Sequence, residues 1–294
     1  MRKVLPNLWY VLMPSDRLKS GANLPQTIFD QSTFISRSHD DQLHIALRGE
    51  VTNKAVPEIV CCEQQGLIWA YSGSNPATCP RALPCAHDAR PQIAASVELP
   101  CDFDNAVYGL LDPAHVPFVH RSKWWRPRHR LREKTKVYVP HPYGFTMARH
   151  ASTQGELSYR LLGGDVSTEI VFELPALRTE CISGSRGAVC SVTSVTPLSV
   201  SKTRMTHCLY WTMKGFAPFK PLIRYLTLSF LKEDWRVLSR QQEGLRHSPP
   251  QLLVGDADEL MKWYMRISNA WHASQSNGSD FVNPIKGRTL RWRS

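Results

Sequence analysis

Residues 104–120 read D-N-A-V-Y-G-L-L-D-P-A-H-V-P-F-V-H and place Asp112, His115 and His120 in an otherwise apolar run. In an α-helix, which turns about 100° per residue, Asp112 and His115 would share a face, whereas the two histidines would point roughly 140° apart. Pro117 lies between the histidines, and proline kinks a helix because it removes an i→i−4 hydrogen bond. We therefore expect a bend at Pro117 that turns both imidazoles toward one point, as a transition-metal ion requires.

For a lone pair of histidines, the ordinary explanation is two core residues satisfied by hydrogen bonds. A third residue, far along the chain, favours a metal site. Residues 219–246 carry an apolar stripe at helical spacing, and Asp234 falls on it, away from the face of Lys232, Arg236 and Arg240. The stripe consists of Leu222, Leu226, Phe230, Val237 and Leu238. A carboxylate on a buried face costs free energy unless it is paired or bound to a metal. Two histidines and one carboxylate form the facial triad of non-haem Fe(II) oxygenases.

These two segments carry a family resemblance. D-P-A-H-V-P-F-V-H at 112–120, with E-D-W-R-V-L-S-R-Q-Q at 233–242, resembles the catalytic domain of the Rieske-type non-haem iron ring-hydroxylating oxygenases. The most similar branch contains chlorophyllide a oxygenase and pheophorbide a oxygenase. The matching segments also include N-L-W-Y-V-L at 7–12, C-E-Q-Q-G-L-I-W-A-Y at 62–71 and A-D-E-L-M-K-W-Y-M-R at 257–266. The resemblance therefore covers nearly the whole chain.

The resemblance implies roles for individual residues. His115, His120 and Asp234 match the three ligands of a mononuclear Fe(2+) ion. Asp112 matches the catalytic acidic residue that, in trimers of this family, bridges one subunit's iron site to the electron donor docked from the neighbour. We expect it also to orient one of the histidines. Gly109 stands where close relatives often have a polar residue near the iron.

The Rieske cluster, by contrast, has no complete ligand set in this sequence. Such a 2Fe-2S cluster needs C-x-H and, further on, C-x-x-H. Of the eight cysteines, only Cys85 has a histidine two residues later, at His87, and none has one three residues later. Only a short connection joins Leu47 to Val60, where the relatives carry both cluster loops. We predict no 2Fe-2S cluster on this chain and expect it on a partner.

Oxygenation with an external reductant consumes two electrons per turnover, and oxidation of Fe(II) to Fe(III) supplies one. Without its own cluster the chain must receive the remainder from a separate protein, run slowly, or no longer act as an oxygenase. Because split systems exist in this family, our leading interpretation is a separate Rieske or ferredoxin electron-transfer protein. The formal net charge of +11 predicts that this partner is acidic, since complementary charge speeds encounter. Residues 121–136 concentrate eight Lys and Arg beside Trp124 and Trp125. A solvated basic loop is the simpler interpretation of that segment, and no nucleic-acid-binding motif accompanies it.

The periodicity of the chain predicts an α+β fold. We interpret residues 1–91 as a truncated Rieske-like β domain without cluster ligands, 92–276 as a helix-grip (START/SRPBCC-like) catalytic domain holding the mononuclear iron, and 277–294 as a C-terminal tail, an extended arm able to cross a neighbouring subunit. Strands are expected at 27–37, 43–47, 59–71 and 92–99, then in an antiparallel sheet at 136–139, 144–150, 168–174, 179–183, 188–196 and 204–212. Long helices are expected at 219–246 and 257–274.

Composition bounds the function. The chain of 294 residues is 42% apolar, which is typical of a globular enzyme, and it has no apolar run long enough for a membrane span. No secretory signal is evident, so we expect a cytoplasmic protein. The substrates would be O2 and a small hydrophobic, ring-containing molecule that is hydroxylated, demethylated or similarly oxidised. The resemblance also implies a homo- or hetero-trimer.

Two alternatives remain at this point. One is a catalytically silent helix-grip protein that binds a hydrophobic ligand or regulates a full-length oxygenase. The other is a zinc hydrolase using the same ligands, which the absence of H-E-x-x-H disfavours.

Overall fold

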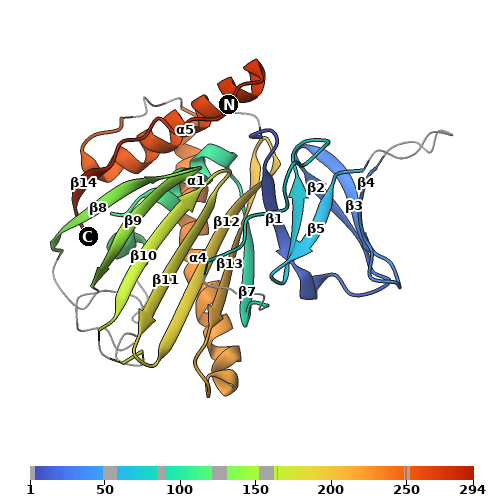
Figure 1. Ribbon diagram of the computed structural model, residues 1–294, viewed down its shortest axis with the longest axis horizontal. Coiled ribbons are helices and arrows are strands. Elements are labelled where there is room, and N and C mark those ends of the chain that lie inside the picture. The colour runs from blue at the N-terminus through green and yellow to red at the C-terminus, as the bar shows by residue number, and fades with distance from the viewer. Residues whose placement is uncertain are drawn as a thin grey trace.

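An eight-stranded antiparallel sheet dominates the structure and is covered by helices on one face (Figure 1). The computed structural model describes residues 4–48, 58–84, 90–120, 131–151, 162–163, 165–247, 249 and 252–294. In spatial order the strands are β14 (Arg288–Arg293), β8 (Glu133–His141), β9 (Gly144–Ala151), β10 (Ser167–Glu173), β11 (Leu177–Gly184), β12 (Gly187–Ser199), β13 (Lys202–Trp211) and β7 (Ile93–Leu99). The predicted α+β class is confirmed.

Strands β8 through β13 lie side by side in the sheet in the order in which they follow one another along the chain. The six alternating runs expected between 136 and 212 are all strands, and each extends beyond its predicted bounds at one end or both. The expectation for the tail needs correction. Its last residues form β14, which pairs antiparallel with β8 of the same chain and buries Leu290 and Trp292. These two residues lie at the two-residue spacing of a strand, a signal too short to stand out in the sequence.

Two three-stranded antiparallel sheets form the N-terminal part of the chain, beside the large sheet in Figure 1. One has the order β1 (Trp9–Pro14), β6 (Leu67–Tyr71), β5 (Cys61–Gln64), and the other the order β2 (Asn23–Ile28), β3 (Gln31–Arg37), β4 (Leu43–Leu47). A short 3-10 helix, Ser15–Arg17, follows β1.

Two of the strands predicted here are in fact hairpins. The strand expected at 27–37 is broken at Phe29 and Asp30, and the one expected at 59–71 is broken at Gln65 and Gly66. All four turn residues have positive φ, the conformation of a two-residue hairpin turn. Three of them are not glycine and rarely adopt this conformation, so the sequence reads as continuous strand.

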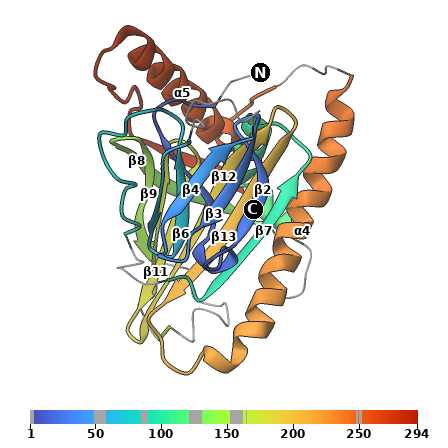
Figure 2. The ribbon, with the colours of Figure 1, turned by 90° about the vertical axis from the view of Figure 1, so that its right-hand side faces the viewer.

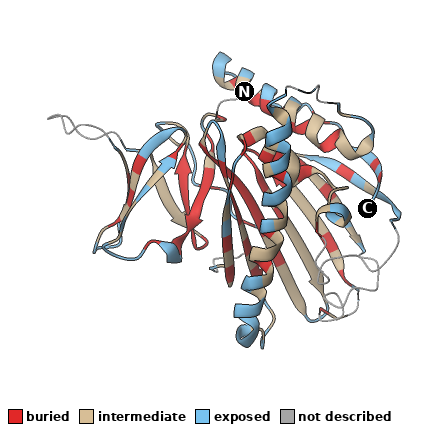
Figure 3. Ribbon diagram, turned by 180° about the vertical axis from the view of Figure 1, so that it is seen from behind, coloured by how far each residue is buried: buried red, intermediate tan, exposed pale blue. Residues whose placement is uncertain are grey.

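The principal helices are α1 (Phe103–Leu111), α2 (Val116–Val119), α4 (Lys220–Leu245) and α5 (Glu259–Asn277), with 3-10 turns at Ala217–Phe219 and Asp256–Asp258. Helix α4 crosses the sheet face seen from behind and runs along the edge strand β7 (Figures 2 and 3). Helix α5 buries Trp263, Tyr264 and Ile267 in the core that it shares with α1 and the sheet. A sheet gripping a long helix is the predicted helix-grip architecture.

The apolar stripe predicted for α4 is wrong in part. Leu222 and Val237 are exposed, and the buried residues of the helix are Thr227, Leu231 and Leu238. These three are spaced by four and seven residues, a narrow line along the helix, whereas the predicted stripe was wider. Among the described residues, no helix combines the length and apolar character needed to cross a membrane.

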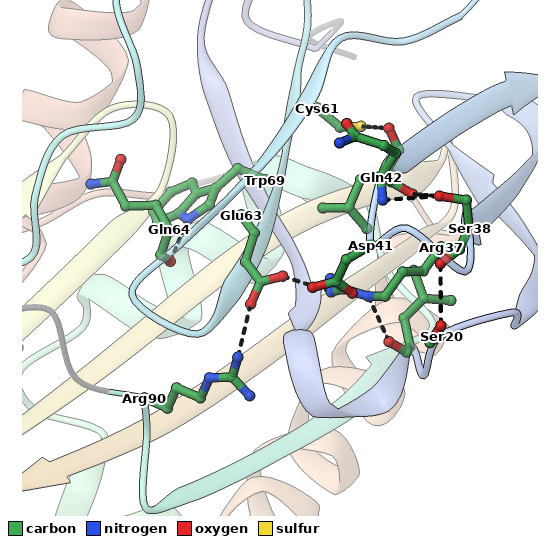
Figure 4. Close-up of polar contacts among 12 residues, drawn as sticks. Ser20, Arg37, Ser38, Asp41, Gln42, Cys61, Glu63, Gln64, Trp69 and Arg90 are labelled. Atoms are coloured by element: carbon green, nitrogen blue, oxygen red, sulfur yellow. Dashed lines mark hydrogen bonds and ion pairs between the residues drawn. The ribbon is translucent and has the colours of Figure 1, made fainter.

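A buried arginine ties the two small sheets together (Figure 4). Arg37 on β3 donates from Nη2 to Glu63 on β5 at 2.6 Å, from Nη1 to Asp41 at 3.0 Å and from Nε to the carbonyl of Leu18 at 2.9 Å. Its side chain is only 8% exposed, against 23% for Glu63 and 75% for Asp41. Arg90 approaches Glu63 from the opposite side, at 3.8 Å. The Arg37–Glu63 pair is therefore the shielded member of this network.

We expect Arg37→Met to lower the free energy of unfolding by about 1–3 kcal/mol, because it leaves Glu63 Oε2 and the Leu18 carbonyl without their donor. The matched control is Asp41→Asn, which tolerates the positive φ of this residue and should cost less than about 1 kcal/mol because the carboxylate is in water. Urea unfolding measures both. Equal losses in the two variants would show that shielding of the pair does not matter.

Candidate metal centre

Both histidines flank one short helix, α2, which is separate from the helix α1 that precedes it. Helix α1 is capped by Asp102, whose side chain accepts from Asn105 N at 3.0 Å, and it ends at Asp112. Proline at 113 causes this end, since a residue before proline is pushed out of the helical region, and Asp112 is extended. Pro117 then lies in the first turn of α2, where proline is tolerated. The bend predicted at Pro117 is wrong in its cause: the chain breaks at 113 instead.

The break brings the two histidines together at the ends of α2. His115 precedes the helix and His120 follows it, with ring centroids 5.3 Å apart. Asp234 reaches both from the middle of α4: its Oδ1 lies 3.3 Å from His120 Nε2 and 3.9 Å from His115 Nε2. One ligand atom from each of the three side chains lies within 4.8 Å of the others, a spacing that can hold a metal ion. The structure therefore brings together the three side chains singled out in the sequence.

Hydrogen bonds fix the tautomer of each imidazole. His115 Nδ1 donates to the carbonyl of Asp112 at 2.5 Å, since a carbonyl can only accept. His120 Nδ1 donates to Glu233 Oε2 at 3.1 Å. Each Nε2 is thus left with a lone pair, and both lone pairs belong to the atoms nearest Asp234. Metal-binding histidines are held in this way by carboxylates and carbonyls behind them.

His120 provides the test of whether a metal fits. Its ring is fully buried and stacks on Phe230, with centroids 3.7 Å apart and planes at 16°. Its Nε2 has no hydrogen-bond partner within the described part of the chain. A buried polar atom without a partner is costly, and a metal ion would supply the missing interaction. Together with an imidazole and a carboxylate beside it, this orphaned nitrogen fits a divalent transition metal.

Burial sets the protonation of the cluster. It lowers the pKa of His120 to about 3, with a smaller contribution from His115. It also lowers the pKa of His115, although the Asp112 carbonyl opposes this shift. Both imidazoles are therefore neutral at pH 7, as ligands must be. Burial, assisted by the charge of Glu233, raises the pKa of Asp234 to about 7. A divalent cation would reverse that shift by stabilising the carboxylate.

Asp112 contacts the site through its backbone. Its carbonyl orients His115, whereas its carboxylate turns back to accept from Ala114 N at 2.8 Å. The predicted orienting contact is thus present, but it is not made by the side chain. Gly109 faces the side chain of Leu238, 3.4 Å from where a Cβ would stand.

Sequence reasoning missed the groups that support the ligands. Glu233 was passed over although it directly precedes Asp234. Phe230, Glu233 and Asp234 are three and four residues apart, so they share a helix face, and all three meet the His120 ring. Two predicted features fall on positions without described structure: most of the basic segment, at 121–130, and the Cys85–His87 pair.

The metal centre lies in a segment that matches a known protein family. Residues 99–274 match the family described as the vanillate O-demethylase oxygenase C-terminal domain. The chain belongs to this family. The match covers more than half of the 294 residues and contains both histidines and Asp234. The predicted resemblance to Rieske-type oxygenases is confirmed.

Individual relatives are more distant. The chain is 25% identical over 160 residues to the chloroplastic chlorophyllide a oxygenase of Oryza sativa subsp. japonica, a match that spans 40% of this chain and only 29% of that protein. Dicamba monooxygenase bound to dicamba superposes with a TM-score of 0.69 at 16% identity, over 94% of this chain and 100% of the other. NdmA of Pseudomonas putida CBB5, with theobromine, superposes at 0.66 and 13% identity over 95% and 96%. These structures show a shared fold with Rieske oxygenases.

Proposed function

We propose that this chain is the mononuclear non-haem Fe(II) component of an oxygenase, with His115, His120 and Asp234 as the iron ligands. The observation that carries the proposal is the convergence of three ligand atoms on one buried point where His120 Nε2 has no other described partner. Membership of an oxygenase family favours iron over zinc. A solved dicamba monooxygenase structure contains non-haem iron and supports the same choice.

His115, His120 and Asp234 would hold the iron, which would supply the activation of dioxygen. The protein's own residues prepare that site. Asp112 and Glu233 hold the imidazoles so that each Nε2 faces Asp234. Phe230 covers the His120 ring and excludes water from it. The substrate is a hydrophobic, ring-containing small molecule that is hydroxylated, demethylated or similarly oxidised.

The electrons come from a separate, acidic Rieske or ferredoxin protein. The support lies in the surface around the iron ligands. Phe118 of α2 is 56% exposed and Trp235 of α4 is 43% exposed, each within two residues of a ligand. Lys232 and Arg236 are on the same stretch of α4, and Arg236 is exposed. Apolar side chains with cations beside them favour an acidic partner. Asp112, whose carbonyl accepts from His115 Nδ1, lies on the electron path.

The direct test has two readouts. Protein loaded with Fe(II) without oxygen is analysed for bound iron, with wild type expected near one iron per chain and His115→Ala near zero. The control is His247→Ala, an exposed histidine at the end of α4, which should keep its iron. Oxygen uptake is then followed with vanillate as probe, with and without an added Rieske ferredoxin, its reductase and NADH.

We expect uptake only when the ferredoxin is present, and none for His115→Ala. Equal iron content in wild type and His115→Ala would overturn the ligand assignment. Iron bound as expected, but no uptake with any of a series of ferredoxins and aromatic probes, would favour the catalytically silent ligand-binding protein.

A further inference from the structure

The first turns of helix α4 extend beyond the sheet strands that support the rest of the helix (Figures 1 and 3). Farther along, the face of α4 that packs on the protein carries its buried residues, Thr227, Leu231 and Leu238. Lys220 and Arg224 lie seven and three residues before Thr227 and therefore belong to the same face, yet both are exposed. Within the described part of the chain, this face is thus uncovered over the first two turns.

The opposite side of α4, which faces solvent, changes character at the same point. One line of residues on this side, spaced by three and four, consists of Leu222, Tyr225, Ser229, Lys232, Arg236 and Arg240. From Lys232 onward the line is charged, as expected for a helix face in water. In the first two turns it is apolar instead: Leu222 is 47% exposed, Tyr225 is 69% exposed, and Phe219 beside them is 56% exposed. Adjacent large apolar side chains in water favour a contact surface.

Cations surround these apolar side chains. Lys214, Lys220 and Arg224 are all exposed and lie within eleven residues of one another. Residues 181–232, which include this whole segment, contain no Asp or Glu. The positive charge of the segment is therefore not neutralised by any acid within it, and it adds to a chain whose formal net charge is already +11.

A further cation joins them from the sheet. Arg186 is exposed at the turn between β11 and β12. The next residue, Gly187, lies against the segment that leads to α4, since a Cβ on it would stand 2.8 Å from the Cγ of Met213. We call this surface the basic tip, and it consists of Arg186, Lys214, Phe219, Lys220, Leu222, Arg224 and Tyr225.

The shape and charge of the basic tip fit the surface of an anionic membrane better than they fit a protein. A stable protein interface buries about 800 Å² of each partner, whereas the tip is a narrow projection that carries a few apolar side chains (Figure 3). A bilayer surface requires only a few inserted apolar side chains with cations beside them. A second copy of this chain would bring like charge to a basic surface.

We propose that the basic tip binds anionic lipid bilayers, with Phe219, Leu222 and Tyr225 inserted at the boundary between headgroups and acyl chains. The cations of the tip contact the lipid phosphates. Tyr225 is ten residues before Trp235, or about 15 Å along the helix, so the tip is separate from the surface proposed for the electron donor. The proposal goes beyond the oxygenase function and does not depend on bound iron.

The test is flotation of the whole chain with vesicles of phosphatidylcholine, either alone or mixed with phosphatidylglycerol. Wild type should bind the mixed vesicles at least about 10-fold more tightly, and this binding should weaken as salt is added. Lys220→Gln/Arg224→Gln should lower the affinity for mixed vesicles by about 10- to 30-fold, since each cation near an anionic surface contributes about fivefold. The charge-matched control is Lys286→Gln/Arg293→Gln, which removes two exposed cations beside β14, at the other edge of the sheet. It should lower the affinity by less than about threefold.

A second double variant removes apolar surface and keeps every charge. Phe219→Ser/Leu222→Ser should lower the affinity for mixed vesicles by at least about 10-fold. Its control is Leu252→Ser/Val254→Ser, two exposed apolar side chains between α4 and α5, which should bind as wild type does. All the substituted side chains are exposed, and thermal unfolding shows whether each variant keeps the fold.

Two results would overturn the proposal. The first is wild-type protein that does not bind the mixed vesicles at low salt. The second is an equal loss of affinity in the tip variants and in their controls, because binding would then follow from net charge or general apolar exposure. Sedimentation velocity on the same samples tests the competing occupant. Self-association that Phe219→Ser/Leu222→Ser abolishes, with vesicle binding unchanged, would make the tip a contact between copies of the chain and refute the lipid assignment.

Discussion

Asp234→Asn should remove iron from the protein and, at the same time, make the iron-free protein more stable above pH 7. An amide is a far weaker ligand than a carboxylate, so bound iron should fall from near one per chain to near zero. The iron-free variant should nevertheless be more stable than iron-free wild type. Burial and the nearby charge of Glu233 together raise the pKa of the Asp234 carboxyl group from 3.8 to about 7. Without a metal, the ionised form of Asp234 is therefore held in the fold at a cost.

The pH dependence of this stability difference follows from proton binding by Asp234. The folded iron-free chain holds the Asp234 proton more tightly than the unfolded chain does. Below about pH 4 the Asp234 carboxyl group is protonated in both the folded and the unfolded chain, so it does not change the free energy of unfolding. The cost develops as pH rises from about 4 to 7 and is complete above 7, where it amounts to at most about 4 kcal/mol. The amide that replaces the carboxyl group in the variant cannot ionise and escapes this cost.

Thermal unfolding of iron-free wild type and variant between pH 4 and pH 8.5 measures this difference. We expect the two curves to converge at the acid end and to separate in favour of Asp234→Asn above pH 7. The control is Asp280→Asn, an exposed aspartate after α5, which should follow wild type throughout. A variant that is less stable than wild type at pH 8 would mean that the carboxylate stabilises the fold without a metal.

The sequence predicted the large sheet well because its signals are local. Six strands between 136 and 212 alternate apolar and polar residues, and turn residues separate them. The hairpins at Phe29–Asp30 and Gln65–Gly66 were missed because non-glycine residues rarely take positive φ and only tertiary contacts show that these do. The register of β14 against β8 is a long-range pairing that no local pattern contains.

The ligands were predictable and their support was not. A polar residue on an apolar stripe can be recognised from the sequence alone, and this pattern identified Asp234. The spacing of the residues around His115 and His120 identified the two histidines. The break at Pro113 was missed because either proline could have redirected the chain. Glu233 was missed because acidic residues on helices are common, and its role depends on a histidine more than a hundred residues away.

Glu233→Gln should weaken Fe(II) binding by about 10- to 100-fold, the usual effect of removing the acid behind a histidine ligand. The Glu233 carboxylate accepts from His120 Nδ1 at 3.1 Å and thereby keeps the lone pair on the Nε2 that faces Asp234. Glutamine preserves the shape of the side chain but offers only a neutral acceptor, so His120 becomes a weaker ligand and a negative charge near the cation is lost.

A second effect of the same change opposes the first. The charge of Glu233 contributes, after burial, to the raised pKa of Asp234, so its removal makes the Asp234 carboxylate easier to ionise. Below pH 7 this gain offsets part of the loss, whereas at pH 8 Asp234 is already ionised and no gain remains. The fold-loss of affinity should therefore be larger at pH 8 than at pH 6.

Anaerobic competition between the protein and a chelator for Fe(II) measures this affinity, with Glu243→Gln, exposed on the same helix, as the control. Affinity equal to wild type at pH 8 would remove Glu233 from the metal centre, and a loss that is the same at both pH values would show that its charge does not act through Asp234.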